Sequence, residues 1–267
     1  MVQLIIFTDL DGTLLDHHTY SYAPAKRALA EIKASAIPLI LISSKTPAEI
    51  LSLHKNMVLN SPFVCENGAA IFWPEGTGYK KQALVPERGI LLKVLADLRT
   101  EFNFKFMAFA DCTTQKLAEL TGLSLAQAAL AGQREFTEPL LWQDTAARRE
   151  IFIEQLVQRK LQAQQGGRFL TVMGESTKAE AMKLLIAHYA ARQPVVTMAL
   201  GDSFNDEAML QGADIAVIIK SAHSSQLKVE LPEWIIHTEE AGPKGWQEAM
   251  DIVLPVMLDT AGNQQII

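Results

Sequence analysis

The chain has 267 residues, of which 49% are apolar, and carries a formal net charge of -6. This size and apolar content allow one large domain or two smaller ones, and the acidic balance without a Lys/Arg cluster argues against a nucleic-acid partner. No apolar run reaches the ~20 residues of a membrane-spanning helix, and no secretory pattern precedes the first apolar run. We therefore expect a cytoplasmic protein with no membrane partner, in which Cys65 and Cys112 are reduced thiols.

Short apolar runs alternate with helical patterns near both ends of the chain, which is typical of a parallel sheet wrapped by helices. Residues 4–8 predict a first strand, Pro24 opens a helix with one apolar face, and residues 37–42 predict a second strand. Thr46-Pro47-Ala48-Glu49 combines an N-cap, a proline and a capping-box glutamate, and so predicts another helix start. Residues 195–200 and 213–219 predict two further buried strands.

The middle of the chain follows a different pattern. It predicts helices over residues 89–102 and 146–161, strands over 104–109 and 135–142, and two short helices within 113–131. We therefore expect an α/β fold: a doubly wound, Rossmann-like parallel-sheet core from residues 1–82 and 176–267, with a smaller α+β cap inserted at 83–175.

The first motif with chemical content is Asp9-Leu10-Asp11-Gly12-Thr13-Leu14, directly after the first predicted strand. Open α/β sheets hold their ligands at the carboxyl ends of their strands. The two carboxylates are therefore candidate catalytic groups, and the glycine lets a substrate approach the backbone. An acidic turn without catalytic function is the alternative that this motif alone leaves open.

Two further motifs could hold an anion. Ser43-Ser44-Lys45-Thr46 places hydroxyls, an ammonium group and helix N-terminal amides after the second predicted strand, although serines there are more often helix caps. Lys178 is predicted to lie in the first turn of a helix capped by Thr177 and Glu180. A lysine opposes the helix dipole there, which suggests a functional role, although an ordinary solvated lysine is an equal alternative.

The fourth motif, Gly201-Asp202-Ser203-Phe204-Asn205-Asp206, follows the strand predicted over 195–200. Asp9, Asp11, Asp202 and Asp206 would thus converge on one sheet edge and repel each other unless a cation lay among them. Carboxylate and carbonyl oxygens are the ligands that Mg²⁺ prefers. The sequence therefore predicts a magnesium site.

With these four motifs in this order, the chain resembles the haloacid dehalogenase superfamily of phosphohydrolases. The resemblance implies that Asp9 is the nucleophile, forming an aspartyl-phosphate, and that Asp11 is the general acid and base. It also implies that Ser43 and Lys178, helped by Asn205, hold the phosphoryl group. Mg²⁺ would be bound by Asp9, the carbonyl group of Asp11, Asp202 and Asp206.

Finer features resemble one branch with a C2B-type cap, the mannosyl-3-phosphoglycerate phosphatases. They are the Ser43–Thr46 motif, Glu66-Asn67-Gly68-Ala69, the stretch from Arg134 to Pro139 and Gly242-Pro243-Lys244-Gly245-Trp246. The resemblance implies a small phosphorylated sugar-glycerate substrate, mannosyl- or glucosyl-3-phosphoglycerate, and seven further residues are candidates to bind it: Ser44, Lys45, Glu66, Asn67, Arg134, Glu138 and Asn205. Lys45 and Arg134 suit its carboxylate, whereas Glu66, Asn67 and Glu138 could bind sugar hydroxyls.

Three alternatives stay open at this point. The chain could hydrolyse another sugar phosphate, or it could be a phosphomutase or phosphotransferase that uses the same aspartyl-phosphate. It could also be a silent binding protein, which the four filled motifs disfavour. The sequence does not distinguish mannose from glucose and leaves the oligomeric state open.

Overall fold

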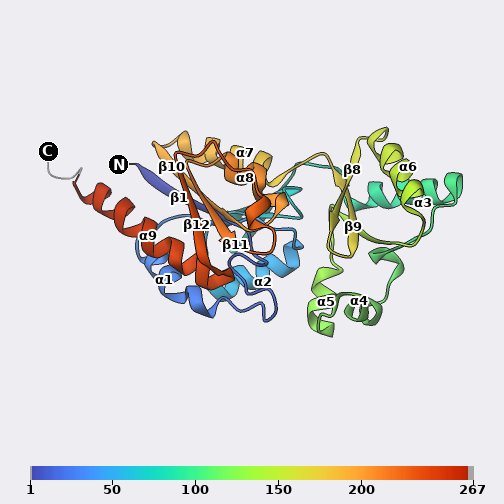
Figure 1. Cartoon of the computed structure of the whole chain (residues 1–267), viewed down its shortest axis with the longest axis horizontal. Coiled ribbons are helices and arrows are strands. Elements are labelled where there is room, and N and C mark those ends of the chain that lie inside the picture. The colour runs from blue at the N-terminus through green and yellow to red at the C-terminus, as the bar shows by residue number, and fades with distance from the viewer. Residues whose placement is uncertain (1, 264–267) are drawn as a thin grey trace.

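The structure is a computed structural model that describes the backbone of residues 2–263 and the side chains of residues 2–258. Elements from both ends of the chain form a larger unit, and elements from the middle form a smaller one beside it (Figure 1). The described helices include none with the length and apolarity needed to cross a bilayer.

The larger unit is built on a five-stranded parallel sheet with the strand order β12-β11-β10-β1-β2. Helices α1, α2 and α9 cover one face and α7 and α8 cover the other, so the sheet is buried on both sides (Figure 1). The fold is therefore the predicted α/β class with a doubly covered parallel sheet. The bounds are β1 Gln3–Thr8, α1 Lys26–Ala34, β2 Leu39–Leu41, α2 Pro47–Met57, α7 Lys178–Ala190, β10 Val195–Gly201, α8 Glu207–Gln211, β11 Ile215–Lys220, β12 Trp234–Ala241 and α9 Gly242–Asn263.

The order of the strands creates a crevice at one edge of this sheet. Strand β1 lies between β2 and β10, and Thr8 at its end is in register with both Leu41 and Leu200. The chain leaves β1 toward β2 on one side and returns on the other side through β10. Ligands of open α/β sheets bind at such a switch point, beyond the carboxyl ends of the strands.

A small antiparallel sheet, β3-β4-β5, continues from this edge. Its strands are β3 Phe63–Cys65, β4 Ala70–Glu75 and β5 Gly78–Ala83. The turn between β3 and β4 contains Glu66, Asn67 and Gly68, all with positive φ. This turn lies against the start of α7, because Gly68 approaches the backbone of Thr177.

The smaller unit has an antiparallel sheet with the order β6-β7-β9-β8. Helices α3 and α6 pack on one face of this sheet, while α4 and α5 lie to one side (Figure 1). The bounds are α3 Arg88–Phe102, β6 Phe106–Ala108, α4 Thr114–Thr121, α5 Leu125–Ala131, β7 Glu138–Trp142, α6 Ala146–Val157, β8 Leu161–Gly166 and β9 Phe169–Gly174. We keep residues 83–175 as the proposed bounds of this cap. Short 3-10 turns lie at Ala23–Ala25, Phe109–Asp111, Phe204–Asp206 and Ser224–Gln226.

Most predicted elements are present, and the strands expected over 37–42, 104–109 and 135–142 are shorter than predicted. The helix predicted to reach residue 161 ends at Val157, because Leu161 begins β8. Strands β3–β5, the hairpin β8–β9, strand β12 and helices α8 and α9 were not predicted. Strands β8 and β12 have many exposed, polar positions, which give them little apolar alternation.

A substitution at Gly68 tests the packing of this turn on α7. Gly76 is the control, because its φ is also positive. A Cβ at Gly68 (φ +99°) would lie 2.2 Å from the carbonyl oxygen of Thr177, whereas at Gly76 (φ +58°) nothing lies within 4 Å. We expect Gly76→Ala to cost about 1–2 kcal/mol for its left-handed backbone and Gly68→Ala to cost about 1–3 kcal/mol more from overpacking. Urea unfolding measures both, and equal losses would contradict the contact.

Candidate active site

Three acidic side chains meet at the carboxyl edge of the core sheet. Asp9 directly follows β1, and its backbone N–H donates to the carbonyl oxygen of Leu200 at 3.0 Å. Asp202 and Asp206 follow β10, and Asp206 is fully buried. Each of the three aspartates offers a carboxylate oxygen, and these oxygens lie within 4.8 Å of one another. The acidic groups of the first and fourth motifs are therefore neighbours in space.

Lys178 connects two of these carboxylates. It is the first residue of α7, whose capping box is formed by Thr177 and Glu180 as the spacing predicts. Its Nζ donates to Oδ1 of Asp9 at 2.5 Å and to Oδ1 of Asp206 at 2.6 Å, and the side chain is 1% exposed. The two ion pairs offset the unfavourable helix dipole at this position.

Burial controls the charge state of this cluster. Burial raises the pKa of the Asp9 carboxyl to about 8, despite the neighbouring Lys178 ammonium. Burial and the Asp206 carboxylate raise the pKa of Asp202 to about 6. Burial alone would lower the pKa of Lys178, but the two carboxylates outweigh it and raise that pKa. One ammonium group thus faces three carboxylates, which leaves excess negative charge in a dry site.

The residues present fit a hard divalent cation. The three aspartates supply oxygen ligands of the kind that Mg²⁺ binds, and a cation would neutralise their excess charge. Gly12 also matters, because a Cβ at this position would lie 2.8 Å from Oδ2 of Asp202. Thr13 Oγ1 donates to the other oxygen of Asp202 at 3.1 Å and orients it. These residues would hold the cation between β1 and β10.

Asp11 lies beside the cluster in a different environment. Its Oδ2 forms an ion pair with Nζ of Lys45 at 2.9 Å, and its Oδ1 is buried without a hydrogen-bond partner in the described chain. Lys45 also contacts Glu49 at 3.7 Å and lies over the ring of Tyr20. Burial opposes the charge on Lys45, but Asp11 and Glu49 raise its pKa. Asp11 thus has one oxygen available to a reacting atom.

The second motif supplies polar groups from the end of β2. Ser43 is fully buried, and its Oγ accepts from the backbone N–H of Lys45 at 3.2 Å. Its carbonyl oxygen accepts from the N–H of Asn67 at 2.9 Å. Asn205 Nδ2 in turn donates to Oδ1 of Asn67 at 3.3 Å. Three predicted site residues from separate segments are therefore joined at this edge.

A cavity of about 490 Å³ is lined by both units. This volume is typical of small-molecule sites. Six of the predicted site residues line it: Asp11, Ser44, Lys45, Asn67, Arg134 and Asn205.

The comparison with protein families agrees with this geometry. Residues 6–117 and 140–241 match the family of haloacid dehalogenase-like hydrolases. The chain belongs to this family. The matched segments carry all four motifs, including Asp9, Ser43, Lys178 and Asp202.

Solved structures share the fold of this haloacid dehalogenase-like hydrolase. BT1666 from Bacteroides thetaiotaomicron, described among phosphatases of the superfamily, is 18% identical with a TM-score of 0.67, covering 94% of each chain. TM0651 from Thermotoga maritima is 17% identical with a TM-score of 0.66, covering 95% of this chain and 98% of its own. The subclass IIB sugar phosphatase BT4131 is also 17% identical, with a TM-score of 0.64 and coverages of 93% and 98%.

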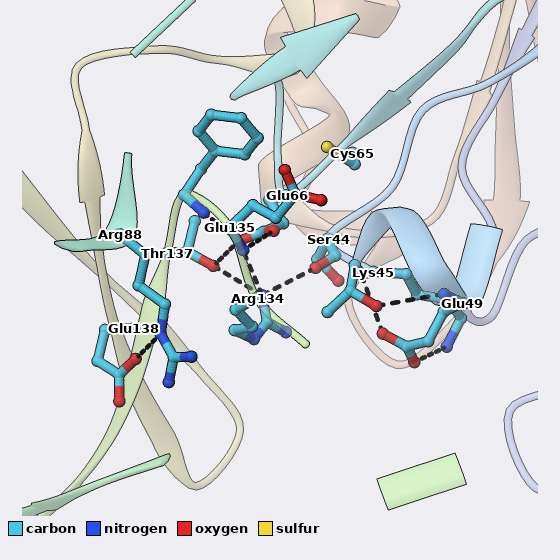
Figure 2. A network of polar contacts seen from close by, with 12 residues as sticks. Ser44, Lys45, Glu49, Cys65, Glu66, Arg88, Arg134, Glu135, Thr137 and Glu138 are labelled. Atoms are coloured by element: carbon cyan, nitrogen blue, oxygen red, sulfur yellow. Dashed lines mark hydrogen bonds and ion pairs between the residues drawn. The ribbon is translucent and has the colours of Figure 1, made fainter. Parts of the chain in front are cut away.

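Glu66 has a structural role in this hydrolase. Its carboxylate accepts from the backbone N–H groups of Glu135 and Phe136 and from the Thr137 hydroxyl, so it fastens the cap to the core. Arg134 lies 3.7 Å from Glu66 and donates to the carbonyl oxygen of Ser44 and to Oγ1 of Thr137 (Figure 2). Arg134 thus joins the cap to the loop of the second motif.

Glu66 and Glu138 make their contacts within the protein. Oε2 of Glu138 accepts from Nε of Arg88 at 2.5 Å (Figure 2), and Oε1 accepts from the N–H of Ala110 at 2.7 Å. Both oxygens of each glutamate already accept hydrogen bonds from the protein, both residues are buried, and neither lines the cavity. Glu66 accepts from the donors of the cap segment 135–137, and Glu138 accepts from two other cap residues, whereas sugar binding by these two glutamates stays a prediction.

Several cavity residues were missed in the sequence. Glu49 was interpreted only as a capping glutamate, and Phe204 stood inside the fourth motif without a role, yet its ring is 53% exposed and lines the cavity. Gln164 and Thr171 also line it, from the hairpin that was not predicted. For these residues, the one signal in the sequence was the position of Phe204 inside the fourth motif, beside predicted site residues.

The acid cluster predicts how cation binding depends on pH. The pKa of Asp9 is about 8 and that of Asp202 is about 6, both above the ordinary carboxyl pKa. Below these two pKa values, protons compete with the cation for the carboxylates. In the metal-free protein, the free energy of unfolding therefore falls as pH rises from the ordinary carboxyl pKa to about 8. We expect Mg²⁺ to raise Tm much more at about pH 9 than at about pH 6.

Calorimetric or fluorescence melting curves measure this difference. Asp202→Asn is the matched variant, because it removes a ligand charge and should abolish most of the Mg²⁺-dependent rise. A rise in Tm that is independent of pH, or one retained in Asp202→Asn, would contradict the assignment of the cation to this cluster.

Proposed function

We propose that the protein is a Mg²⁺-dependent phosphatase that hydrolyses mannosyl- or glucosyl-3-phosphoglycerate to the glycosylglycerate and phosphate through an aspartyl-phosphate on Asp9. One observation carries the proposal for the reaction. A buried, unpartnered carboxylate oxygen of Asp11 lies two residues from a nucleophile, Asp9, that a lysine and two further aspartates surround. This combination supplies a nucleophile, an acid–base group and an anion site within one edge of the sheet.

Asp9 would attack phosphorus with a carboxylate oxygen. Lys178 holds Oδ1 of Asp9 at 2.5 Å, which fixes the direction of the side chain and lowers the repulsion between the carboxylate and a phosphate dianion. The bond from phosphorus to the ester oxygen breaks as the bond to Asp9 forms. The Ser43 hydroxyl and Asn205 amide would donate to the equatorial oxygens.

Asp11 would serve both half-reactions. Its Oδ1 gives a proton to the leaving alcohol and then takes one from the water that hydrolyses the aspartyl-phosphate. The ion pair with Lys45 holds the other oxygen and orients the carboxyl group. When bound by Asp9, the Asp11 carbonyl, Asp202 and Asp206, Mg²⁺ supplies positive charge for the transferring phosphoryl group.

The substrate assignment rests on the cavity and on resemblance. Arg134 and Lys45 line the cavity and are suited to the glycerate carboxylate, although both already have protein partners. The features shared with mannosyl-3-phosphoglycerate phosphatases and the fold shared with the sugar phosphatase BT4131 agree with a phosphorylated sugar. The partner is then a small molecule in the cytoplasm, with no nucleic acid or membrane.

A substrate panel tests this assignment. With Mg²⁺ present, phosphate release is compared for mannosyl-3-phosphoglycerate, glucosyl-3-phosphoglycerate, free 3-phosphoglycerate and common hexose phosphates. We expect kcat/KM for one glycosyl ester to exceed the others about 100-fold, or about 2.7 kcal/mol of transition-state discrimination. A profile that favours simple hexose phosphates would overturn the glycosylglycerate assignment but not the phosphatase reaction.

Asp11→Asn tests the acid–base assignment. An amide can neither protonate the leaving alcohol nor activate water, so we expect turnover to fall about 10²–10⁴-fold. An ester with a good leaving group should still phosphorylate Asp9, so rapid-quench kinetics should show a burst followed by slow release. Asp9→Asn is the control without a nucleophile and should show no burst. Wild-type rates in Asp11→Asn would assign the acid–base role to another residue.

A further inference from the structure

The cap sheet has one face that its own helices do not cover. Leu170 and Val172 of β9 are buried against α3 and α6, so Thr171 between them points to the opposite face. Thr171 is in register with Pro139 of β7 and with Gln164 of β8. These three residues form one row across the sheet, and all three line the cavity.

Two polar side chains in this row have no partner within the described chain. No hydrogen bond engages the Gln164 amide or the Thr171 hydroxyl, although both residues are half-buried. The other glutamines of β8 are engaged: the amide of Gln162 donates to Gly174 and Ser176, and that of Gln165 to Gly167 and Phe169, all at carbonyl oxygens. Their polar atoms are open to the cavity and not buried, so a ligand that enters it can replace water as their partner.

The charges of the cavity restrict what that ligand can be. Among the cap residues that line it in the described chain, Arg134 is the one charged side chain, and its guanidinium is bound to Ser44 and Thr137. A second phosphate would require several cationic donors there. An amide and a hydroxyl both donate and accept, which matches alcohol groups.

We propose that Gln164 and Thr171 bind hydroxyl groups of the leaving alcohol, and that the substrate is therefore a monoester of an uncharged polyol portion with at most one additional anionic group. This inference rests on the proposed phosphatase function and adds the residues that read the part of the substrate distant from phosphorus. It also disfavours a bisphosphate intermediate, which a phosphomutase would have to hold in this cavity.

The test compares an ester whose alcohol carries many hydroxyl groups with one whose alcohol carries few. The quantity measured is the ratio of kcat/KM for the preferred glycosyl ester to that for free 3-phosphoglycerate, which lacks the sugar. We expect Gln164→Ala to lower this ratio about 10-fold, the effect of one lost hydrogen bond. Thr171→Val should lower it in the same direction. Gln165→Ala is the control: this residue is of the same type, lies next to Gln164 in the strand and also lines the cavity, but its amide donates inside the hairpin.

A second measurement distinguishes the loss of a hydrogen bond to the substrate from a change in the shape of the cavity. With a deoxy analogue that lacks the hydroxyl bound by Gln164, the wild type and Gln164→Ala should have equal kcat/KM, as a double-mutant cycle requires. Unchanged selectivity in Gln164→Ala would overturn the inference, and so would an equal loss of selectivity in Gln165→Ala.

Failure of the proposed substrate is distinguishable from failure of this inference. If the panel shows that hexose phosphates are preferred, the same comparison uses glucose 6-phosphate and its 2-deoxy analogue. Loss of discrimination in Gln164→Ala would then support the hydroxyl contact although the glycosylglycerate assignment had failed. A wild type that hydrolyses 3-phosphoglycerate as well as every hydroxyl-rich ester would overturn the inference and leave the phosphatase reaction in place.

Discussion

The Lys178 ammonium lies between the buried carboxylates of Asp9 and Asp206, and the rest of the active site depends on this arrangement. Asp9 and Asp206 follow the neighbouring parallel strands β1 and β10, and Lys178 reaches both from the first turn of α7. Buried ion pairs contribute little net stability, whereas removing one partner leaves an uncompensated charge and is costly. The fold therefore maintains a cluster that favours reactivity over stability. Its excess negative charge favours the binding of a cation.

The same edge also controls how the cap meets the core. The loop after β2 provides the Ser43 hydroxyl and Lys45, and it is also where the cap docks. The Ser44 carbonyl accepts from Arg134, and the Thr46 hydroxyl donates to the carbonyl oxygen of Leu130 at 2.9 Å. Because docking and chemistry share one loop, we expect closure of the cap and the placement of Lys45 on Asp11 to be coupled. Closure would also exclude bulk water from the reacting phosphoryl group.

Local rules explain what the sequence could predict. The capping boxes at Thr46 and Thr177 and the strand before Asp9 depend on neighbours within four residues, and the structure has them. Roles that depend on tertiary contacts could not be predicted in this way. Glu66 resembles a substrate ligand by residue type, but its partners lie about 70 residues later and appear only when the cap folds back. Gln164 was missed because β8 becomes a strand through pairing with β9, not through its own apolar pattern.

The central claim is that Asp9 becomes covalently phosphorylated during turnover. The most direct measurement is acid quenching of the enzyme with substrate and Mg²⁺, followed by digestion and mass spectrometry of the peptide that contains Asp9. The account predicts one phosphoryl group on Asp9, lost after treatment with hydroxylamine and increased in Asp11→Asn when the substrate is an ester with a good leaving group. Phosphate release from an enzyme that carries no phosphoryl group, or carries it on another residue, would contradict the account.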